Sequence, residues 1–202
     1  DLEGVTALLS VSPYYNKPSQ EGIYQHYLRI AEASPIPVIL YNVPGRTSSN
    51  ISAETTVKLA QDFDNIIAIK EASGNLDQIT EIILHRPEDF AVISGDDNLT
   101  YAMMGLGAEG VISVSGQGVP EVFCAMVDAM IDGDLPTALE NHLALYHLTN
   151  LLFKEGNPAG IKALLNQRGV CLPFVRLPLA PASEDLTQEI SVALTRLGIS
   201  TD

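Results

Sequence analysis

Short apolar runs alternate with stretches of helical periodicity along the first 133 residues of the chain. The apolar runs begin near Val5, Pro37, Ile66, Phe90 and Gly110 and are rich in β-branched residues, as is typical of strands buried on both faces. Each run is followed by a segment in which apolar residues recur every three or four positions. Five βα units in succession predict a parallel sheet.

Capping residues and apolar stripes support three of the connecting helices. Ser19 is expected to begin the first helix, Ser52 the second and Asn75 the third. The apolar positions expected to face the sheet are Ile23, Tyr27, Ile30 and Ala31 in the first helix, Val57 and Ala60 in the second, and Leu76, Ile79, Ile82 and Ile83 in the third.

The alternation stops after Gly133. Helical patterns follow over residues 135–155, 158–168 and 183–197, and Gly and Pro residues separate them. We therefore predict two domains, a partial TIM barrel over residues 1–133 and a C-terminal helical domain over residues 134–202.

Polar and reactive residue types collect where each predicted strand ends. In a TIM barrel all such ends converge on one face, whereas a doubly wound sheet would need a phosphate-binding loop after its first strand, which is not seen here. Strand starts lie roughly 26 residues apart, so a barrel of eight units would need roughly 80 residues more. The sequence thus predicts an α/β (β/α)8 barrel of which this chain holds about five units, beginning inside the fourth. The residues at the strand ends are Ser12, Pro13, Tyr14, Tyr15, Tyr41, Asn42, Lys70, Glu71, Gly95, Asp96, Asp97 and Ser113 to Ser115.

Charge and composition limit the classes of partner that the protein can bind and the compartment in which it is expected. The 25 acidic residues against 11 basic ones give a formal charge of −14, which opposes general binding to nucleic acid or anionic lipid. The apolar runs are too short to span a bilayer and the first residues lack a signal-peptide pattern, so a cytoplasmic protein is expected. Cys124 and Cys171 stand far apart in apolar settings and are expected to be buried thiols without a disulfide.

Lys70 is unusual because it ends an apolar, strand-like run, Ile66-Ile67-Ala68-Ile69. Burial disfavours an ammonium, so it can lower the pKa of the amine and provide a nucleophile for Schiff-base formation near neutral pH. In the alternative interpretation, Lys70 pairs with a carboxylate at the rim of the sheet and has only a structural role.

Tyr41 and Arg46 follow the preceding strand. A phenol beside an ammonium is expected to be acidified and to pass protons, although a tyrosine at a strand end often only packs its ring. Arg46 lies in a loop of Pro and Gly and can grip a carboxylate through two hydrogen bonds, or can be a simple surface residue.

Three other patterns favour structural roles. The GxGxxG sequence at residues 105–110 closes a helix and leads into a strand, so it predicts a tight turn and no dinucleotide. Asp96 and Asp97 could bind a metal or act as an acid–base pair, but capping of the next helix is favoured. The four histidines have no spacing typical of metal ligands, so no metal is predicted; they are His26, His85, His142 and His147.

Five segments, taken in order over nearly the whole chain, resemble the 4-hydroxy-tetrahydrodipicolinate synthase (dihydrodipicolinate synthase) family of pyruvate-dependent class I aldolases. The resemblance implies a TIM barrel with a three-helix C-terminal domain, usually as a homotetramer. It also implies condensation of pyruvate with aspartate 4-semialdehyde on the route to diaminopimelate and lysine, without a metal or nucleotide cofactor. The segments are Ser12-Pro13-Tyr14-Tyr15-Asn16-Lys17-Pro18, Tyr41-Asn42-Val43-Pro44-Gly45-Arg46-Thr47, Ile69-Lys70-Glu71-Ala72-Ser73-Gly74, Ser94-Gly95-Asp96-Asp97 and Gly110-Val111-Ile112-Ser113-Val114.

The resemblance also implies a role for individual residues. Lys70 matches the Schiff-base lysine and Tyr41 the proton donor and acceptor, while Tyr15 matches a relay tyrosine that is donated across a subunit interface. Ile112 matches a residue that contacts pyruvate, and Arg46 one that receives the carboxylate of the aldehyde. Tyr14 matches one position of the family's lysine feedback site, an allosteric candidate.

The chain departs from the family pattern in three ways. The family's relay threonine and its glycine-threonine-threonine carboxylate cradle precede residue 1. Most of the lysine feedback site has no counterpart in this chain either. In addition, Ser115-Gly116-Gln117 stands where relatives commonly carry Ala-Asn.

Other functions stay open on the sequence alone. N-acetylneuraminate lyases and 2-keto-3-deoxy sugar acid aldolases share the lysine and the tyrosine, but Arg46 within Pro-Gly-Arg-Thr favours the synthase. A non-catalytic fragment or partner subunit is a second possibility, because the first barrel strands are not in this chain. A metal-dependent barrel enzyme that uses Glu71, Asp96 and Asp97 is a third.

Overall fold

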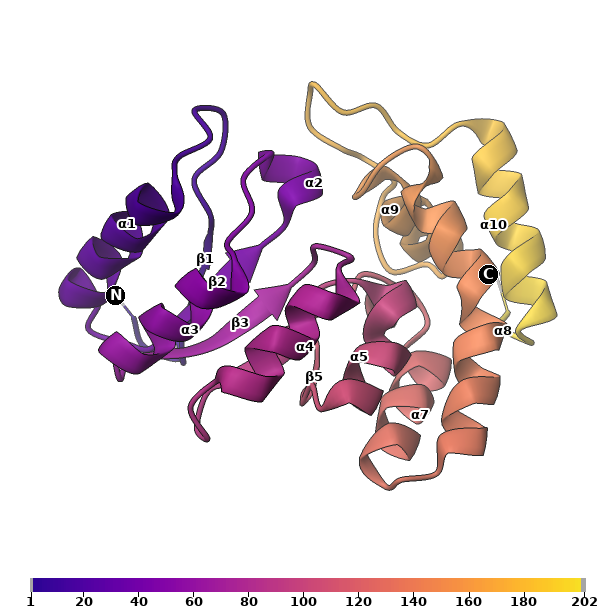
Figure 1. Ribbon diagram of the computed structural model, residues 1–202. Helices are drawn as coiled ribbons and strands as arrows, with labels where there is room; N and C mark the ends of the chain where they lie inside the picture. The colour runs from indigo at the N-terminus through magenta and orange to yellow at the C-terminus, as the bar shows by residue number, and fades with distance from the viewer. Residues whose placement is uncertain (1, 201–202) are drawn as a thin grey trace. The chain divides into compact units, whose positions relative to one another are not determined.

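The computed structural model describes residues 2–200, which form two compact units that divide between Ile112 and Ser113. The first unit is built on a parallel sheet whose five strands are ordered as they occur in the chain (Figure 1). This arrangement confirms the predicted α/β class and is that of consecutive units of a TIM barrel. The strands are β1 (Leu8–Val11), β2 (Val38–Asn42), β3 (Ile66–Glu71), β4 (Ala91–Ser94) and β5 (Gly110–Val111).

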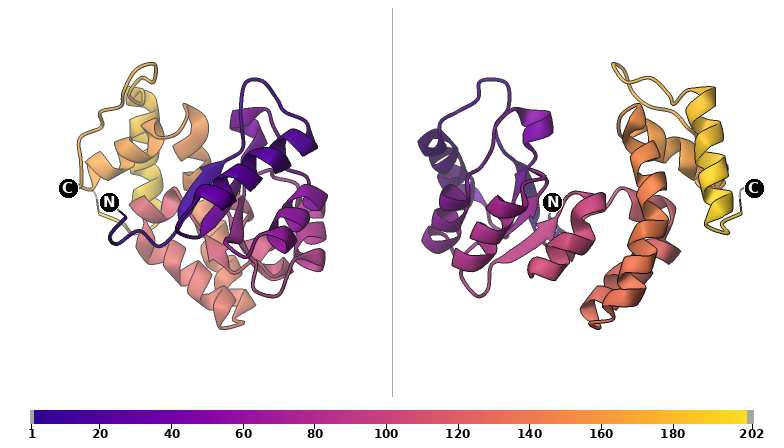
Figure 2. Two further views of the ribbon diagram at one scale, coloured as in Figure 1. Left: turned by 90° about the vertical axis from the view of Figure 1, so that its left-hand side faces the viewer. Right: turned by 45° about the vertical axis from the view of Figure 1, so that its right-hand side comes forward.

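Helices follow the strands and lie on one face of this sheet (Figures 1 and 2). Sequential parallel strands with right-handed crossovers place every connecting helix on the same side. The long helices are α1 (Gln20–Ala33), α3 (Ala53–Asp62), α4 (Leu76–His85) and α5 (Thr100–Leu106), and two short ones, α2 (Pro44–Thr47) and η1 (Asp97–Leu99), follow β2 and β4.

The predicted helix starts are confirmed by their hydrogen bonds. The side chain of Ser19 accepts from the backbone N–H of Gly22, and the Ser52 and Asn75 side chains accept in the same way three residues onward. Each side chain thereby satisfies one of the N–H groups that a helix leaves without an internal partner.

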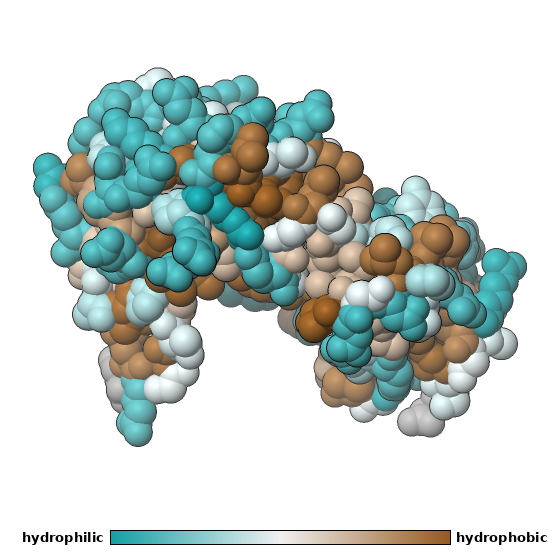
Figure 3. Space-filling model, turned by 60° about the horizontal axis from the view of Figure 1, so that its bottom comes forward, coloured by the Kyte–Doolittle hydropathy of each residue, from teal (hydrophilic) through white to brown (hydrophobic). Residues whose placement is uncertain are grey.

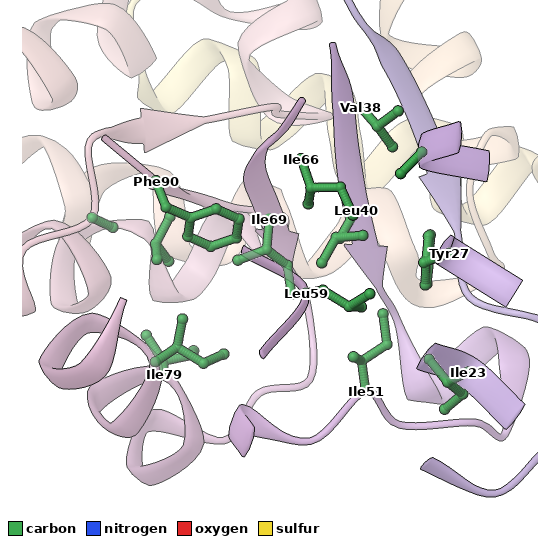
Figure 4. Close-up of a cluster of buried hydrophobic side chains, with 14 of the residues drawn as sticks. Ile23, Tyr27, Val38, Leu40, Ile51, Leu59, Ile66, Ile69, Ile79 and Phe90 are labelled. Atoms are coloured by element: carbon green, nitrogen blue, oxygen red, sulfur yellow. The ribbon is translucent and has the colours of Figure 1, made fainter. Parts of the chain in front are cut away.

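The core of the first unit lies between the sheet and these helices (Figure 4). Leu40 of β2 and Ile69 of β3 pack there with Tyr27 of α1 and Ile79 of α4. The prediction for α3 was partly wrong, because Val57 and Ala60 are only half-buried. Thr56 and Leu59 are the α3 side chains that are fully buried.

The pairing of β2 with β3 contains an irregularity that determines which side chains meet. Val38 pairs with Ile66, but Ile39 pairs with Ala68, so Ile67 is an extra residue on β3. Beyond this bulge the register is regular up to the pair Asn42 and Glu71.

The second unit consists of helices. They are α6 (Ser115–Gly118), α7 (Pro120–Ile131), α8 (Leu135–Lys154), α9 (Ala159–Gln167) and α10 (Glu184–Arg196). Helix α9 passes close to α8 at Gly160, where a Cβ atom would lie 2.7 Å from the Leu152 Cα. The last three helices agree with the predicted ranges to within two residues at each end.

The compact units divide earlier than the predicted domains. The sequence placed the boundary after residue 133, whereas α6 and α7 group with the helical unit because α7 packs along α8. The extent of the barrel domain proper stays a prediction.

Two further expectations need correction. The first strand begins at Leu8 and not near Val5. The thiols are not both buried, because Cys124 is exposed and Cys171 is half-buried. Cys124 lies on the outer side of α7, whose inner side is formed by Phe123, Met126 and Ala129.

On the face shown in Figure 3, polar residues (teal) and apolar residues (brown) are intermixed. Within residues 2–200, every helix is either too short or too polar to cross a membrane.

Candidate active site

Lys70 and Tyr41 meet at the carboxyl ends of neighbouring strands. Lys70 is the penultimate residue of β3, and its in-register partners are Tyr41 on β2 and Ile93 on β4. Partners in a parallel sheet project to the same side, so the amine and the phenol share one face. The Lys70 Nζ atom lies 4.4 Å from the centroid of the Tyr41 ring.

The surroundings of Lys70 favour the neutral amine. Burial lowers the pKa of Lys70 below its ordinary value and is the largest influence. The Asp97 carboxylate opposes this by raising the pKa, and the Arg46 guanidinium adds to the lowering. A carboxylate therefore does act on Lys70, as the structural interpretation expected, but burial outweighs it.

The phenol of Tyr41 differs from the expectation of acidification. Burial raises the pKa of Tyr41, and the Arg46 guanidinium only partly opposes this effect. Loss of solvation disfavours the phenolate more than nearby positive charge favours it. Tyr41 therefore keeps its proton at neutral pH and can donate it to a bound group.

Arg46 lies exposed in α2, on a turn that internal hydrogen bonds hold in place. The Thr47 hydroxyl donates to the carbonyl oxygen of Ser49 at 2.9 Å, and the next residue, Ser48, adopts a left-handed conformation with φ of 55°. The positive charge of the guanidinium acts to lower the pKa of both Lys70 and Tyr41.

Glu71 points to the opposite side of β3, where it is fully buried. Its two carboxylate oxygens accept hydrogen bonds of 3.0 and 3.1 Å from the Asn42 side chain, one of 2.8 Å from the Ser73 backbone N–H and one of 3.0 Å from the Gln78 side chain. Burial raises the pKa of Glu71, and these hydrogen bonds oppose that effect. The network joins the ends of β2 and β3 to α4 and so supports the strand that carries Lys70.

Asp96 and Asp97 lie at the end of the next strand. Asp96 caps the short turn η1, because its side chain accepts from the Asn98 backbone N–H at 3.2 Å. The predicted capping of the helix that follows was wrong, because α5 has Leu99 at its N-cap position and no side-chain cap. Asp97 is buried. Across residues 2–200, no three His, Cys, Asp or Glu side chains are grouped in a way that could hold a metal ion.

The GxGxxG segment forms the predicted turn between α5 and β5. Gly107 ends α5 in a left-handed conformation with φ of 113°, which a residue with a side chain rarely adopts.

The remaining candidate residues lie in the loop after β1 and just after β5. Tyr14 and Tyr15 are 69% and 90% exposed in the loop between β1 and α1, and Tyr15 has a positive φ of 66°. Ile112 follows β5, is 40% exposed, and donates its backbone N–H to the Ser94 carbonyl oxygen at 3.0 Å. The structure thus places the Lys70 amine over the Tyr41 ring, and the charge of Arg46 influences the pKa of both.

Sequence reasoning missed the supporting roles of Asn42, Gln78 and Gly95. The alternation of side chains along β3 is a signal for the first two, because Glu71 must face the helices if Lys70 faces away from them. The close approach of Gly95 to the Lys70 side chain depends on the register between strands, so the sequence of β3 or β4 alone does not indicate it.

Comparison with known proteins agrees with this fold. The sequence model of the Dihydrodipicolinate synthetase family matches residues 2–197. The chain is 53% identical, over 199 residues, to a 4-hydroxy-tetrahydrodipicolinate synthase of Phocaeicola vulgatus, covering 98% of this chain and 67% of that protein. The chain therefore spans about two thirds of the length of this curated relative.

Solved structures give the same result. The crystal structure of dihydrodipicolinate synthase from Aquifex aeolicus has a TM-score of 0.95 and 40% identity, covering 98% of this chain and 68% of that one. A chloride-inhibited dihydrodipicolinate synthase from Acinetobacter baumannii, complexed with pyruvate, has a TM-score of 0.92 and 41% identity, with 97% and 67% covered. The chain belongs to the dihydrodipicolinate synthetase family.

Proposed function

We propose that this protein condenses pyruvate with aspartate 4-semialdehyde to give 4-hydroxy-tetrahydrodipicolinate, through an imine on Lys70. The observation that carries the proposal is the Lys70 amine, which lies over the Tyr41 ring and whose pKa is lowered by burial. A neutral amine is the form that attacks a ketone. The names of the relatives supply the two substrates.

In the proposed reaction, the Lys70 nitrogen attacks the ketone carbon of pyruvate, and loss of water gives a protonated imine. The imine accepts electrons when the methyl group loses a proton, which yields an enamine. The enamine carbon then attacks the aldehyde, whose oxygen takes a proton. Finally, the amine of the second substrate adds to the imine carbon and releases Lys70, which closes the ring.

Tyr41 is proposed as the group that delivers and removes protons during these steps. Its raised pKa keeps it protonated until a basic intermediate forms beside it. The protonated imine is itself the electron sink, so the proposed reaction needs no metal or nucleotide cofactor.

The other assignments follow the resemblance. We propose that Arg46 binds the carboxylate of the aldehyde, that Ile112 contacts pyruvate and that Tyr14 belongs to a lysine-binding site. Tyr15 is proposed to serve a neighbouring subunit of a homo-oligomer, most simply a tetramer, because its ring is almost fully exposed. The protein is proposed to act in the cytoplasm.

The test is to incubate the protein in its natural length with pyruvate and borohydride, and then to locate the adduct by peptide mass. We expect one adduct, on Lys70. We also expect the rate of trapping to rise with pH, with a midpoint below the ordinary pKa of lysine, because only the neutral amine attacks and burial lowers its pKa. An adduct elsewhere, or none, would contradict the imine mechanism.

Substitution of Arg46 separates the synthase from the sugar acid aldolases. In the Arg46→Ala variant we expect the KM for aspartate 4-semialdehyde to rise about 10- to 100-fold, because a charge-assisted hydrogen bond to its carboxylate is lost. The KM for pyruvate should change much less, and the pH midpoint of trapping should move upward because the guanidinium contributes to the lowered pKa of Lys70. Arg29→Ala is the matched control, because Arg29 is an exposed arginine on α1 that pairs with Glu32. An unchanged KM for the aldehyde would remove the reason for preferring the synthase.

A further inference from the structure

Gly95 lies against the side chain of Lys70. A Cβ atom at position 95 would be 2.9 Å from the Lys70 Cε and 3.1 Å from its Cγ, and also 2.9 Å from the Ala72 Cβ. Carbon atoms in contact are ordinarily about 3.5–4.0 Å apart. The space that a side chain would take at position 95 is therefore already filled, mainly by the stem of the lysine.

The backbone of Gly95 has little freedom to move away from the lysine. Its N–H donates to the Glu71 carbonyl oxygen at 2.8 Å, which continues the ladder between β3 and β4. Gly95 is not among the glycines with positive φ, so its backbone conformation is open to other residues. What the fold requires at this position is the absence of a side chain.

We propose that Gly95 is a positioning residue for Lys70. Its missing side chain leaves a slot along which the lysine stem runs, and this slot holds the amine over the Tyr41 ring. The proposal rests on the proposed role of Lys70 as the imine-forming residue.

The slot matters because a lysine side chain has four rotatable bonds and its amine can reach many places. A Cβ atom at position 95 would meet Cγ and Cε, which are separated by one carbon, and would push the outer half of the stem aside. The amine would then leave its half-buried position over the Tyr41 ring. Misplacement by about 1 Å in a reacting group can cost about 100-fold in rate.

The test compares Gly95→Ala with the unchanged protein in its natural length, using borohydride trapping of the pyruvate adduct. We expect trapping to slow about 100-fold and its pH midpoint to move upward, because a displaced amine regains solvent and its pKa returns toward the ordinary value. Gly105→Ala is the matched control: Gly105 lies in α5 without positive φ, and a Cβ atom there would meet nothing within 4 Å. The control should trap at the original rate.

A double variant distinguishes positioning of the lysine from general strain. Ala72→Gly combined with Gly95→Ala removes the contact with the Ala72 Cβ but keeps the contacts with Lys70. We expect the melting temperature to recover toward that of the unchanged protein while trapping stays slow. If the single variant does not fold, trapping can be measured on the double variant in its place.

Two results would overturn the proposal. One is a Gly95→Ala variant that traps pyruvate at the original rate and pH midpoint. The other is a double variant in which trapping recovers together with stability. If the unchanged protein forms no adduct on Lys70, the proposed function fails, and that result is distinct from either of these.

Discussion

Replacement of Lys70 with arginine is expected to reduce condensation to the background rate and to abolish the pyruvate adduct. Arginine keeps a positive charge and a long stem near Tyr41, but its guanidinium stays protonated and cannot form the imine. The fold should persist, because Lys70 is only half-buried and the Glu71 network on the other face of β3 is untouched. The measurements are the rate of product formation, the mass of trapped protein and the melting temperature.

Lys58→Arg is the control for this experiment. The Lys58 Nζ atom lies 4.2 Å from the centroid of the Tyr24 ring, which resembles the geometry of Lys70 and Tyr41, but Lys58 is exposed on α3. Its replacement should leave activity and trapping unchanged. Substantial condensation by the Lys70→Arg variant would rule out the imine mechanism.

Replacement of Tyr41 with phenylalanine is expected to lower kcat about 10²- to 10⁴-fold. The ring that lies below the Lys70 amine remains, whereas the hydroxyl that transfers protons is lost, and general acid–base catalysis contributes effects of this size. Because the amine keeps its surroundings, an adduct on Lys70 should still accumulate, only more slowly. Rapid mixing followed by borohydride quenching separates imine formation from the later steps.

Tyr24→Phe is the matched control for the tyrosine. The Tyr24 hydroxyl donates to the Asp62 carboxylate at 2.7 Å on the outer surface of the helices, so its loss should not change kcat. If Tyr41→Phe had the same kcat as the unchanged protein, another group or water would have to carry the protons.

Much of the first unit could be predicted from local pattern. Strand positions, helix starts and the convergence of reactive residues at strand ends depend on nearby sequence, and Ser19 and Asn75 cap their helices as expected. Lys70 and Tyr41 were identifiable because a polar residue that ends an apolar strand is conspicuous.

The features that could not be predicted depend on contacts between strands. The acidity of Tyr41 is set by the balance of burial against the charge of Arg46, and burial is a property of the assembled structure. The contact between Gly95 and Lys70 and the hydrogen bonds from Asn42 to Glu71 depend on register, which no single strand encodes. Cys124 was misplaced because an apolar helix gives little information on which side faces the neighbouring helix.

The bulge at Ile67 has an evolutionary consequence for this site. If Ile67 paired regularly with Ile39 and did not bulge, the pairing that starts with Val38 and Ile66 would bring Lys70 opposite Asn42, on the side of the sheet that packs against helices. The bulge returns Lys70 to the side of the sheet that carries Tyr41. The length of β3 before the bulge can therefore vary without changing the side that the amine faces. Ala68 and Ile69 lie between the bulge and Lys70. One residue inserted there would place a different residue opposite Tyr41 and turn Lys70 to the other side of the sheet. Mutational tolerance to insertion and deletion should therefore change abruptly in the middle of β3.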